Sequence, residues 1–508
     1  PAVTGVQTCA LPIFITMNKT RTRFAPSPTG YMHIGNLRTA LFEFLIAKHE
    51  GGDFLLRIED TDQERKVEGA VDVIYKTLKE CGLNWDEGPD IGGDFGPYVQ
   101  SERLPMYKGY AEDLIKLGGA HYCFCSEEEI EAQRKEAESL GISFKFNDPC
   151  KHLSAEEVQA KLDAGEPYVI RQTIKDVGET YFDDEVYGRI EVDGDVLDEQ
   201  ILIKSDGYPT YNFANIIDDH QMQISHVVRG NEYLSSTPKY NLIYDAYGWQ
   251  RPTYVHVPPV MKDEHHKLSK RNGDASFQDL VAKGYLPDAI MNYIALLGWA
   301  PETEQEIYTL DELIKVFNIH RISKSPAIFD IDKLTWMNGV YLRNMDEETY
   351  YETVRPYLEK AVHGPYNLKE IAKIIQPRID ILNQIEESVD FFDTLVDYDL
   401  EMYRHKKMKT TPEVALKALK ASKQTLEAFD QWDSMDALHE CLLALPKELE
   451  MKNGQVLWPI RTAVSGKQFT PGGAIEIAFI LGKDETLRRI QVGIDRLSEI
   501  VEDRKSVV

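Results

Sequence analysis

The sequence predicts an α/β fold with a parallel sheet toward its N-terminal side and a mostly helical region toward its C-terminal side. Two observations indicate this. The segments TRFAP and DFLLRI have the composition of buried strands and flank an amphipathic helical run, which is the strand–helix–strand order of a parallel sheet. Past about residue 345, helical runs such as DEETYYETVRPYLEKAV, LKEIAKIIQPRIDILNQIEE and TPEVALKALKASKQTLEAF replace this alternation.

The length and charge of the chain limit the classes of protein to consider. With 508 residues, it is too long for one hydrophobic core and predicts several domains. It carries 57 basic and 84 acidic residues, a formal net charge of −27, which disfavours a general polyanion binder. A nucleic-acid enzyme with its basic groups on one face stays compatible with this balance. No stretch approaches the roughly 20 apolar residues of a membrane helix, so we expect no membrane partner.

The first sixteen residues, PAVTGVQTCALPIFIT, contain no charged residue. A secretory signal peptide begins with a basic segment and a transit peptide is rich in arginine, so neither is predicted. Met17, followed by the basic NKTRTR, is the expected start, and we expect residues 1–16 to be a non-native leader.

The stretch APSPTGYMHIGN at residues 25–36 predicts a rigid loop at the start of a helix. Prolines fix the backbone angle φ and glycine frees it, and the helical run NLRTALFEFLIAKHE follows, with Gly51-Gly52 as its stop. A helix N-terminus presents unpaired N–H groups and a partial positive charge, which suits a triphosphate. His33 can donate to phosphate oxygens, and Gly35 lets a nucleotide base pack against the backbone.

A second loop, KLSKR at residues 267–271, carries lysines that can close over phosphates and neutralise charge as pyrophosphate leaves. Either loop alone occurs by chance in many proteins. Together they indicate nucleotide chemistry.

Three of the six cysteines gather with a histidine: CFC is followed after twenty-four residues by CKH, that is, Cys123, Cys125, Cys150 and His152. Such soft and borderline donors suit tetrahedral Zn²⁺ in a structural role, because four protein ligands leave no open position. Buried free cysteines are the alternative. The pattern favours a reducing, cytoplasmic compartment over disulfides.

In order along the chain, APSPTGYMHIGN, RIEDTD, SDGYPTYNFANIIDDH and KLSKR resemble the bacterial glutamyl-tRNA synthetases of class I. The first and last segments correspond to the family's HIGH and KMSKS signatures, with Asn36 in place of the second histidine and Arg271 at the end of the lysine loop. The resemblance runs from about Thr20 to near the C-terminus. The glutaminyl relatives carry a different opening loop.

This resemblance implies a Rossmann-like parallel-sheet catalytic domain with an inserted acceptor-binding domain, followed by a mostly α-helical anticodon-binding region. Arg378 matches a family position near the anticodon, although an exposed helix arginine is an equal alternative. The implied divisions are 17–120 and 206–260 for the catalytic domain, 121–205 for the insertion with the zinc site, 261–345 for a stem-contact region with the lysine loop, and 346–508 for the anticodon-binding domain.

The resemblance also implies the activity: ATP, with Mg²⁺, activates L-glutamate to glutamyl-adenylate, and the glutamyl group passes to the 3′-terminal ribose of tRNA(Glu). His33, Lys267 and Lys270 would stabilise charge, and His33, Gly35 and Lys270 would contact ATP.

Because glutamate brings two carboxylates and an ammonium, its pocket needs cations and an anion. The matching positions are Arg23, Ala25, Ser27, Glu59, Tyr211, Asn215 and Arg229. We expect a monomer, and the sequence is compatible with charging of tRNA(Glu) alone or of tRNA(Gln) as well.

Three other interpretations compete. A shorter paralogue glutamylates a modified base of a tRNA anticodon, but it lacks a C-terminal helical domain. A small-molecule nucleotidyltransferase would share only the first loop and would not need the arginine pair. A non-catalytic tRNA-binding relic would not be expected to keep both loops intact.

Lys270→Ala is expected to lower adenylate formation far more than it weakens glutamate binding, because the lysine's charge matters most as pyrophosphate leaves. Pyrophosphate exchange measured over a range of glutamate and ATP concentrations checks this. Unchanged turnover with a raised KM for ATP alone would contradict that role.

Overall fold

The computed structural model describes residues 19–61, 67–175, 178–268 and 276–506. The expected leader at residues 1–16 lies outside them. Two compact units are present: Pro1–Leu280 with Ile290–Asp330, and Val281–Ala289 with Ile331–Val508.

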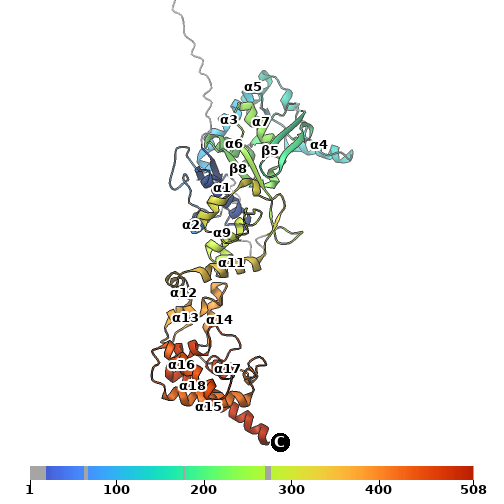
Figure 1. The fold of residues 1–508 in the computed structure, drawn as a ribbon. Helices are drawn as coiled ribbons and strands as arrows, with labels where there is room; N and C mark the ends of the chain where they lie inside the picture. The colour runs from blue at the N-terminus through green and yellow to red at the C-terminus, as the bar shows by residue number, and fades with distance from the viewer. Residues whose placement is uncertain (1–18, 62–66, 176–177, 269–275, 507–508) are drawn as a thin grey trace, which may run out of the picture. The chain divides into compact units, whose positions relative to one another are not determined.

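A parallel sheet forms the centre of the first unit (Figure 1). Strand β1 (Arg21–Phe24) pairs in parallel with β2 (Asp53–Leu56), and β8 (His226–Gly230) pairs in parallel with β9 (Thr253–Val257). The N–H of Ser225 donates to the carbonyl of Arg21 at 2.9 Å, which places β8 beside β1. The strands predicted in TRFAP and DFLLRI are therefore confirmed.

Helix α1 (Ile34–His49) connects β1 to β2 and confirms the predicted helical run. His33 caps its first turn, and Gly51, at φ +65°, follows its end in the left-handed region that glycine adopts without strain. Leu37 and Leu41 are fully buried. Lys48, at the same helical spacing, instead reaches the carboxylate of Asp86 at 2.7 Å. The helix therefore packs its apolar residues into the core and ends near solvent.

Antiparallel strands fill the segment between β2 and β8. Strands β3 (Ala120–Cys123), β4 (Val169–Gln172) and β7 (Ile201–Ile203) form one sheet. Strand β5 (Glu179–Asp184) forms a hairpin with β6 (Gly188–Asp193) and meets β9 in parallel at Asp184. The hairpin thereby extends the main sheet.

Helices cover these sheets. Ser126 and Ser154 begin α4 and α5 with capping boxes. The other elements of the first unit, or spanning its edge, are α2 (Ala70–Glu80), α3 (Leu104–Lys116), α4 (Glu127–Ser139), α5 (Ala155–Asp163), α6 (Tyr211–Gln221), α7 (Thr237–Tyr247), α8 (Phe277–Ala282), α9 (Pro287–Ala295), α10 (Leu310–Val316), β10 (Val260–Met261) and β11 (Ala327–Ile328).

The second unit is helical. Its helices are α11 (Ile331–Asn344), α12 (Glu347–Ala361), α13 (Leu368–Ile375), α14 (Ile385–Val389), α15 (Pro412–Ala428), α16 (Met435–Glu448), α17 (Asn453–Ser465) and α18 (Ala474–Ser506). Thr411 caps α15 through its side chain, and Leu419 and Leu426 are fully buried while Leu416 is half-buried. Across the described residues, no helix combines the length and apolar character needed to cross a membrane.

One predicted helical run is broken. The segment LKEIAKIIQPRIDILNQIEE forms α13, ends at Ile375 and becomes helical again only in a 3₁₀ turn at Leu382–Gln384 and in α14. The cause is Pro377, which has no N–H to donate to a carbonyl one turn earlier in the helix. Arg378 therefore lies in the turn that follows α13 and not within a helix.

Arg489 is the polar centre of the second unit. Its buried guanidinium donates to the carbonyls of Phe391, Phe392 and Val464 at 2.7–2.8 Å and to the carboxylate of Glu485 at 2.6 Å. It therefore joins α18 to α17 and to the segment after α14.

Arg489→Leu is expected to destabilise the second unit by about 3–5 kcal/mol, because it leaves buried carbonyls without donors and breaks a buried ion pair. The matched control is Arg488→Leu, since Arg488 pairs with the same Glu485 but its side chain is 56% exposed. Thermal unfolding of the full chain should show a large fall in midpoint for the first variant and little change for the second. Equal shifts would contradict the role of Arg489.

Candidate functional site

The two signature loops meet at His33. Its Nδ1 accepts the N–H of Gly35 at 3.0 Å, so the ring proton lies on Nε2, which donates to the carbonyl of Leu268 at 3.0 Å. Lys267 is exposed and pairs through its backbone with Met261. Lys270 lies outside the described residues. The structure thus brings the start of the lysine loop to the N-terminus of α1, as phosphate chemistry requires.

The predicted glutamate-binding residues lie at one edge of the parallel sheet. Ala25 and Ser27 follow β1, Glu59 follows β2, and Arg229 lies near the carboxyl end of β8. Because carboxyl ends of parallel strands meet at the same edge, these residues converge beside the N-terminus of α1. Tyr211, at the start of α6, lies within electrostatic reach of Glu59, Arg23 and Arg229.

Arg23 belongs to a buried network of charges. Asp219 accepts from its Nε and Nη2 at 2.8 and 3.2 Å, and Glu43 accepts from its Nη1 at 3.1 Å. Although burial opposes the charged form, Asp219 and Glu43 raise the pKa of Arg23 above its ordinary value. Its guanidinium is therefore held by protein carboxylates within the wall of the site.

Arg57 extends this network to Glu59. It donates to Asp219 at 2.8 Å and to Glu59 at 3.0 Å, and all three side chains are buried. Burial raises the pKa of Glu59 above its ordinary value against the opposing effect of Arg57. Arg57 therefore positions Glu59, the carboxylate predicted to bind an ammonium group, and also donates to Asp219, the partner of Arg23.

Arg229 is buried, with 7% of its surface exposed, yet within the described residues it forms no ion pair with a carboxylate. Its Nε donates to Nε2 of His256 at 3.1 Å, and its Nη2 donates to Oγ1 of Thr237 at 2.7 Å. Three tyrosine rings surround the guanidinium at 4.8–5.5 Å: Tyr233, Tyr240 and Tyr254. A buried cation held only by neutral groups and rings is suited to receiving an anion.

Asn215 adds a donor to the same region. It is buried on α6, and its Nδ2 has no hydrogen-bond partner among the described residues. Nearby, the ring of Tyr211 lies 5.7 Å from that of Tyr233. A buried amide N–H₂ without an acceptor is costly in an empty site and is satisfied when a ligand supplies one.

The cysteine cluster also assembles. One ligand-type atom from each of Cys123, Cys125, Cys150 and Asp148 lies within 4.8 Å of the others. His152, the predicted fourth ligand, is exposed and is not among them. Burial raises the pKa of the Cys123 thiol to about 11, so metal binding there would displace a proton. The donor set of three sulfurs and a carboxylate fits Zn²⁺.

Asp148 occupies the place expected for His152 because it begins the 3₁₀ turn that carries Cys150. Its carboxylate accepts the N–H of Cys150 at 2.9 Å and contacts His121 at 3.0 Å. Despite burial, hydrogen bonds from His121 and Cys123 hold the pKa of Asp148 well below its usual range. The C-x-C…C spacing indicates the cysteines but carries no signal for this aspartate.

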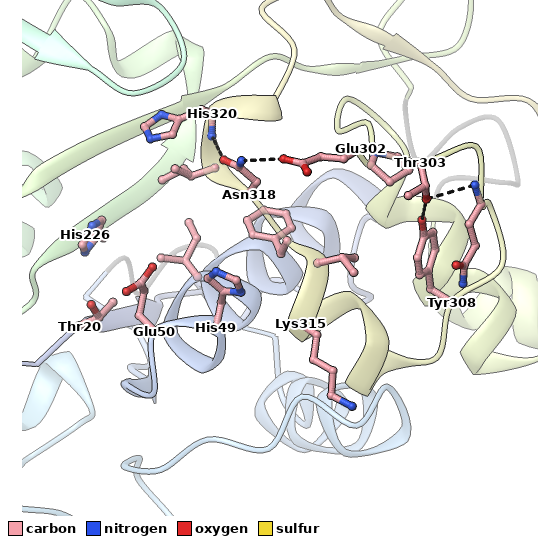
Figure 2. A pocket seen from close by; sticks show the side chains of 16 residues that line it. Thr20, His49, Glu50, His226, Glu302, Thr303, Tyr308, Lys315, Asn318 and His320 are labelled. Atoms are coloured by element: carbon pink, nitrogen blue, oxygen red, sulfur yellow. Dashed lines mark hydrogen bonds between the residues drawn. The ribbon is translucent and has the colours of Figure 1, made fainter.

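A cavity of about 800 Å³ lies elsewhere in the first unit (Figure 2). Thr20 precedes β1, His226 begins β8, and His49 and Glu50 lie at the end of α1, so this cavity lies at the amino ends of the strands. Figure 2 shows Asn318 and His320 on its other side. It is therefore separate from the edge where the predicted residues converge.

Several residues of the site carry no clear signal in the sequence. Glu43 lies within the apolar run of α1, and Thr237 and His256 belong to segments without a recognisable motif. Asp219 is the exception, because it lies inside the motif SDGYPTYNFANIIDDH, one of the four segments that carry the family resemblance.

Comparisons with known proteins agree with this geometry. Residues 19–336 match the family described as tRNA synthetases class I (E and Q), catalytic domain, and residues 349–494 match an anticodon binding domain. A glutamate–tRNA ligase of Clostridium botulinum is 60% identical over 483 residues, covering 95% of this chain and 99% of the relative. That of Clostridium tetani is 59% identical, covering 94% and 98%.

Among solved structures, a glutamate tRNA ligase from Elizabethkingia meningosepticum in complex with its amino acid matches with a TM-score of 0.86 and 34% identity, over 94% of this chain and 100% of that one. The resemblance inferred from the four motifs is thus confirmed, as is the α/β fold with a helical C-terminal region. The chain therefore belongs to the class I tRNA synthetases, within the glutamate–tRNA ligases.

Proposed function

We propose that this chain joins L-glutamate to tRNA(Glu) with the predicted residues in the predicted roles. The observation that carries the proposal is Arg229, a buried cation with no carboxylate partner among the described residues, at the same sheet edge as the joined signature loops. Pyrophosphate exchange with glutamate, measured with and without tRNA, tests it. Exchange that does not depend on glutamate would overturn it.

In the first step, the α-carboxylate of glutamate attacks the α-phosphate of ATP, and pyrophosphate leaves. His33 would exchange its hydrogen bond with the carbonyl of Leu268 for one to the phosphates at the start of α1, and Lys267 and Lys270 would neutralise the departing charge. Gly35 would leave room for the base. Mg²⁺ bound with ATP would supply further charge neutralisation. No side chain needs to act as a nucleophile, so the contribution of the protein is positioning.

Glutamate would lie with its side-chain carboxylate toward Arg229 and its ammonium toward Glu59. Arg23 lies on β1, which has β2 and β8 as its neighbours, and Asn215 offers an amide Nδ2 without a partner among the described residues. Tyr211, Ala25 and Ser27 would complete the walls. In the second step, a hydroxyl of the terminal ribose of tRNA attacks the glutamyl carbonyl, and AMP leaves.

The second unit supports binding of an anticodon. A pocket of about 770 Å³ is lined by Arg378, Arg461 and Lys467 and by Phe469, which is 83% exposed. Exposed aromatic rings stack unpaired bases, and neighbouring cations hold the backbone. This combination supports the assignment of Arg378 to the anticodon. It also argues against the short paralogue, which has no such domain.

Arg229→Leu is expected to lower kcat/KM for glutamate by several orders of magnitude while the protein stays folded. Glutamine offers Arg229 an amide whose NH₂ cannot accept. An unmade hydrogen bond of this kind costs on the order of 1–3 kcal/mol, and more where charge is involved, as it is when a substrate carboxylate loses its buried cation. The deciding number is the ratio of kcat/KM for glutamate to that for glutamine, with tRNA present. Arg251→Leu is the control, because Arg251 is an exposed arginine paired with Asp245. An unchanged ratio would make Arg229 a structural residue.

We also propose that the protein binds one structural Zn²⁺ through Cys123, Cys125 and Cys150. Cys125→Ser should lose the metal, whereas Cys441→Ser, which lies outside the cluster, should retain it. Metal analysis of the purified variants measures this. His152→Ala and Asp148→Asn, compared in the same assay, identify the fourth donor. An active wild type free of zinc would show that the site is vestigial.

A further inference from the structure

Asp184, at the end of β5, is a fully buried carboxylate that accepts four N–H groups. Its Oδ1 accepts from the backbones of Val186 and Tyr187 at 3.0 and 2.9 Å. Its Oδ2 accepts from the backbone of His256 at 3.0 Å and contacts the Nδ1 of the same residue at 2.6 Å. Neither side chain has exposed surface. The orientation of the His256 ring is therefore fixed from behind.

The contact with Asp184 also fixes the position of the ring proton. A carboxylate surrounded by donors can only accept, so Nδ1 of His256 carries the hydrogen and Nε2 presents a lone pair. Burial lowers the pKa of His256 below its ordinary value, although Asp184 opposes this. The neutral ring is the form that can accept the Nε–H of Arg229, which lies 3.1 Å away.

Thr237 accepts the second hydrogen bond on the same side of Arg229, the one that Nη2 donates. Its Oγ1 donates to the carbonyl of Tyr233 at 2.9 Å, which leaves a lone pair for Nη2 of Arg229 at 2.7 Å. In a guanidinium, Nε and Nη2 form one edge, while Nη1 and the second hydrogen of Nη2 form the other. His256 and Thr237 thus occupy the first edge, and no hydrogen bond within the described part of the chain uses Nη1.

We propose that His256 and Thr237, with Asp184 behind them, position Arg229 so that its Nη1–Nη2 edge meets the side-chain carboxylate of glutamate as a fixed two-pronged donor. This rests on the proposed role of Arg229 and adds the residues that aim it. His256 is a positioning residue: it touches Arg229 and not the substrate. The same arrangement disfavours glutamine, because a guanidinium that cannot rotate cannot turn a donor away from the amide NH₂.

Two variants of His256 separate its two hydrogen bonds. In His256→Gln the amide oxygen replaces the Nε2 acceptor, whereas in His256→Asn the amide nitrogen replaces the Nδ1 donor. The variant His256→Gln is expected to keep KM for glutamate within about threefold of wild type. The variant His256→Asn is expected to raise KM for glutamate about 10- to 100-fold, with KM for ATP unchanged. Pyrophosphate exchange with tRNA present measures both constants.

Thr237→Ser and Thr237→Val provide a nearly isosteric second pair. Serine keeps the hydroxyl that Arg229 needs, and valine removes it, so only valine should raise KM for glutamate. Equal glutamate KM values within both pairs, in folded variants, would overturn the positioning role. A wild type that does not activate glutamate at all would instead overturn the proposed function. A rise in KM for ATP matching that for glutamate would indicate general damage to the site and would also contradict the inference.

Discussion

The sheet edge where the predicted glutamate-binding residues converge depends on one buried carboxylate that joins two buried arginines. Asp219 accepts from Arg23 on β1 and from Arg57, which follows β2, both at 2.8 Å. Removing one partner of such a group is costly, because the remaining charge stays buried. Burial raises the pKa of Glu43 well above its ordinary value, and its Oε2 has no partner among the described residues. Glu43 and Glu59 are the second acceptors, from Arg23 at 3.1 Å and from Arg57 at 3.0 Å, so protein carboxylates compensate both arginines.

This balance explains why the arginines of the site differ in their availability to a ligand. Arg23 and Arg57 are compensated by protein carboxylates and fix the strand ends and Glu59. Arg229 is held by an imidazole, a hydroxyl and tyrosine rings, none of which carries a negative charge when His256 is neutral. An anionic side chain would therefore find in Arg229 a buried cation that no carboxylate of the described residues compensates, and in that setting the interaction is stronger than in water. On the proposed role of Arg229, selectivity for a charged side chain would follow from where the protein places its own carboxylates.

The sequence predicted the parts of this site that recur as motifs or local patterns. The proline–glycine loop, the helix after it and the strands around it depend on neighbouring residues and were predictable. Asp184, His256 and Thr237 come together only through the pairing of β5 with β9 and of β9 with β8, so no local spacing indicates them. For the same reason spacing indicates the three cysteines but not Asp148. The break after Ile375 was predictable from Pro377, whose effect outweighs the surrounding apolar periodicity.

The overall composition pointed away from a polyanion partner, and the family assignment shows why that argument is weak. A net charge of −27 is a sum over the whole chain, whereas charges in solution act over a Debye length of about 8–10 Å. Many acidic groups do not act on a distant phosphate at all: Asp218 and Asp219 are buried against arginines, and Asp184 against backbone N–H groups. Cations meanwhile gather locally: Lys267 precedes Leu268, whose carbonyl meets His33 at the start of α1, and Arg378, Arg461 and Lys467 line one pocket of the second unit. Local placement of charge, and not its total, decides which polyanion an acidic protein can bind.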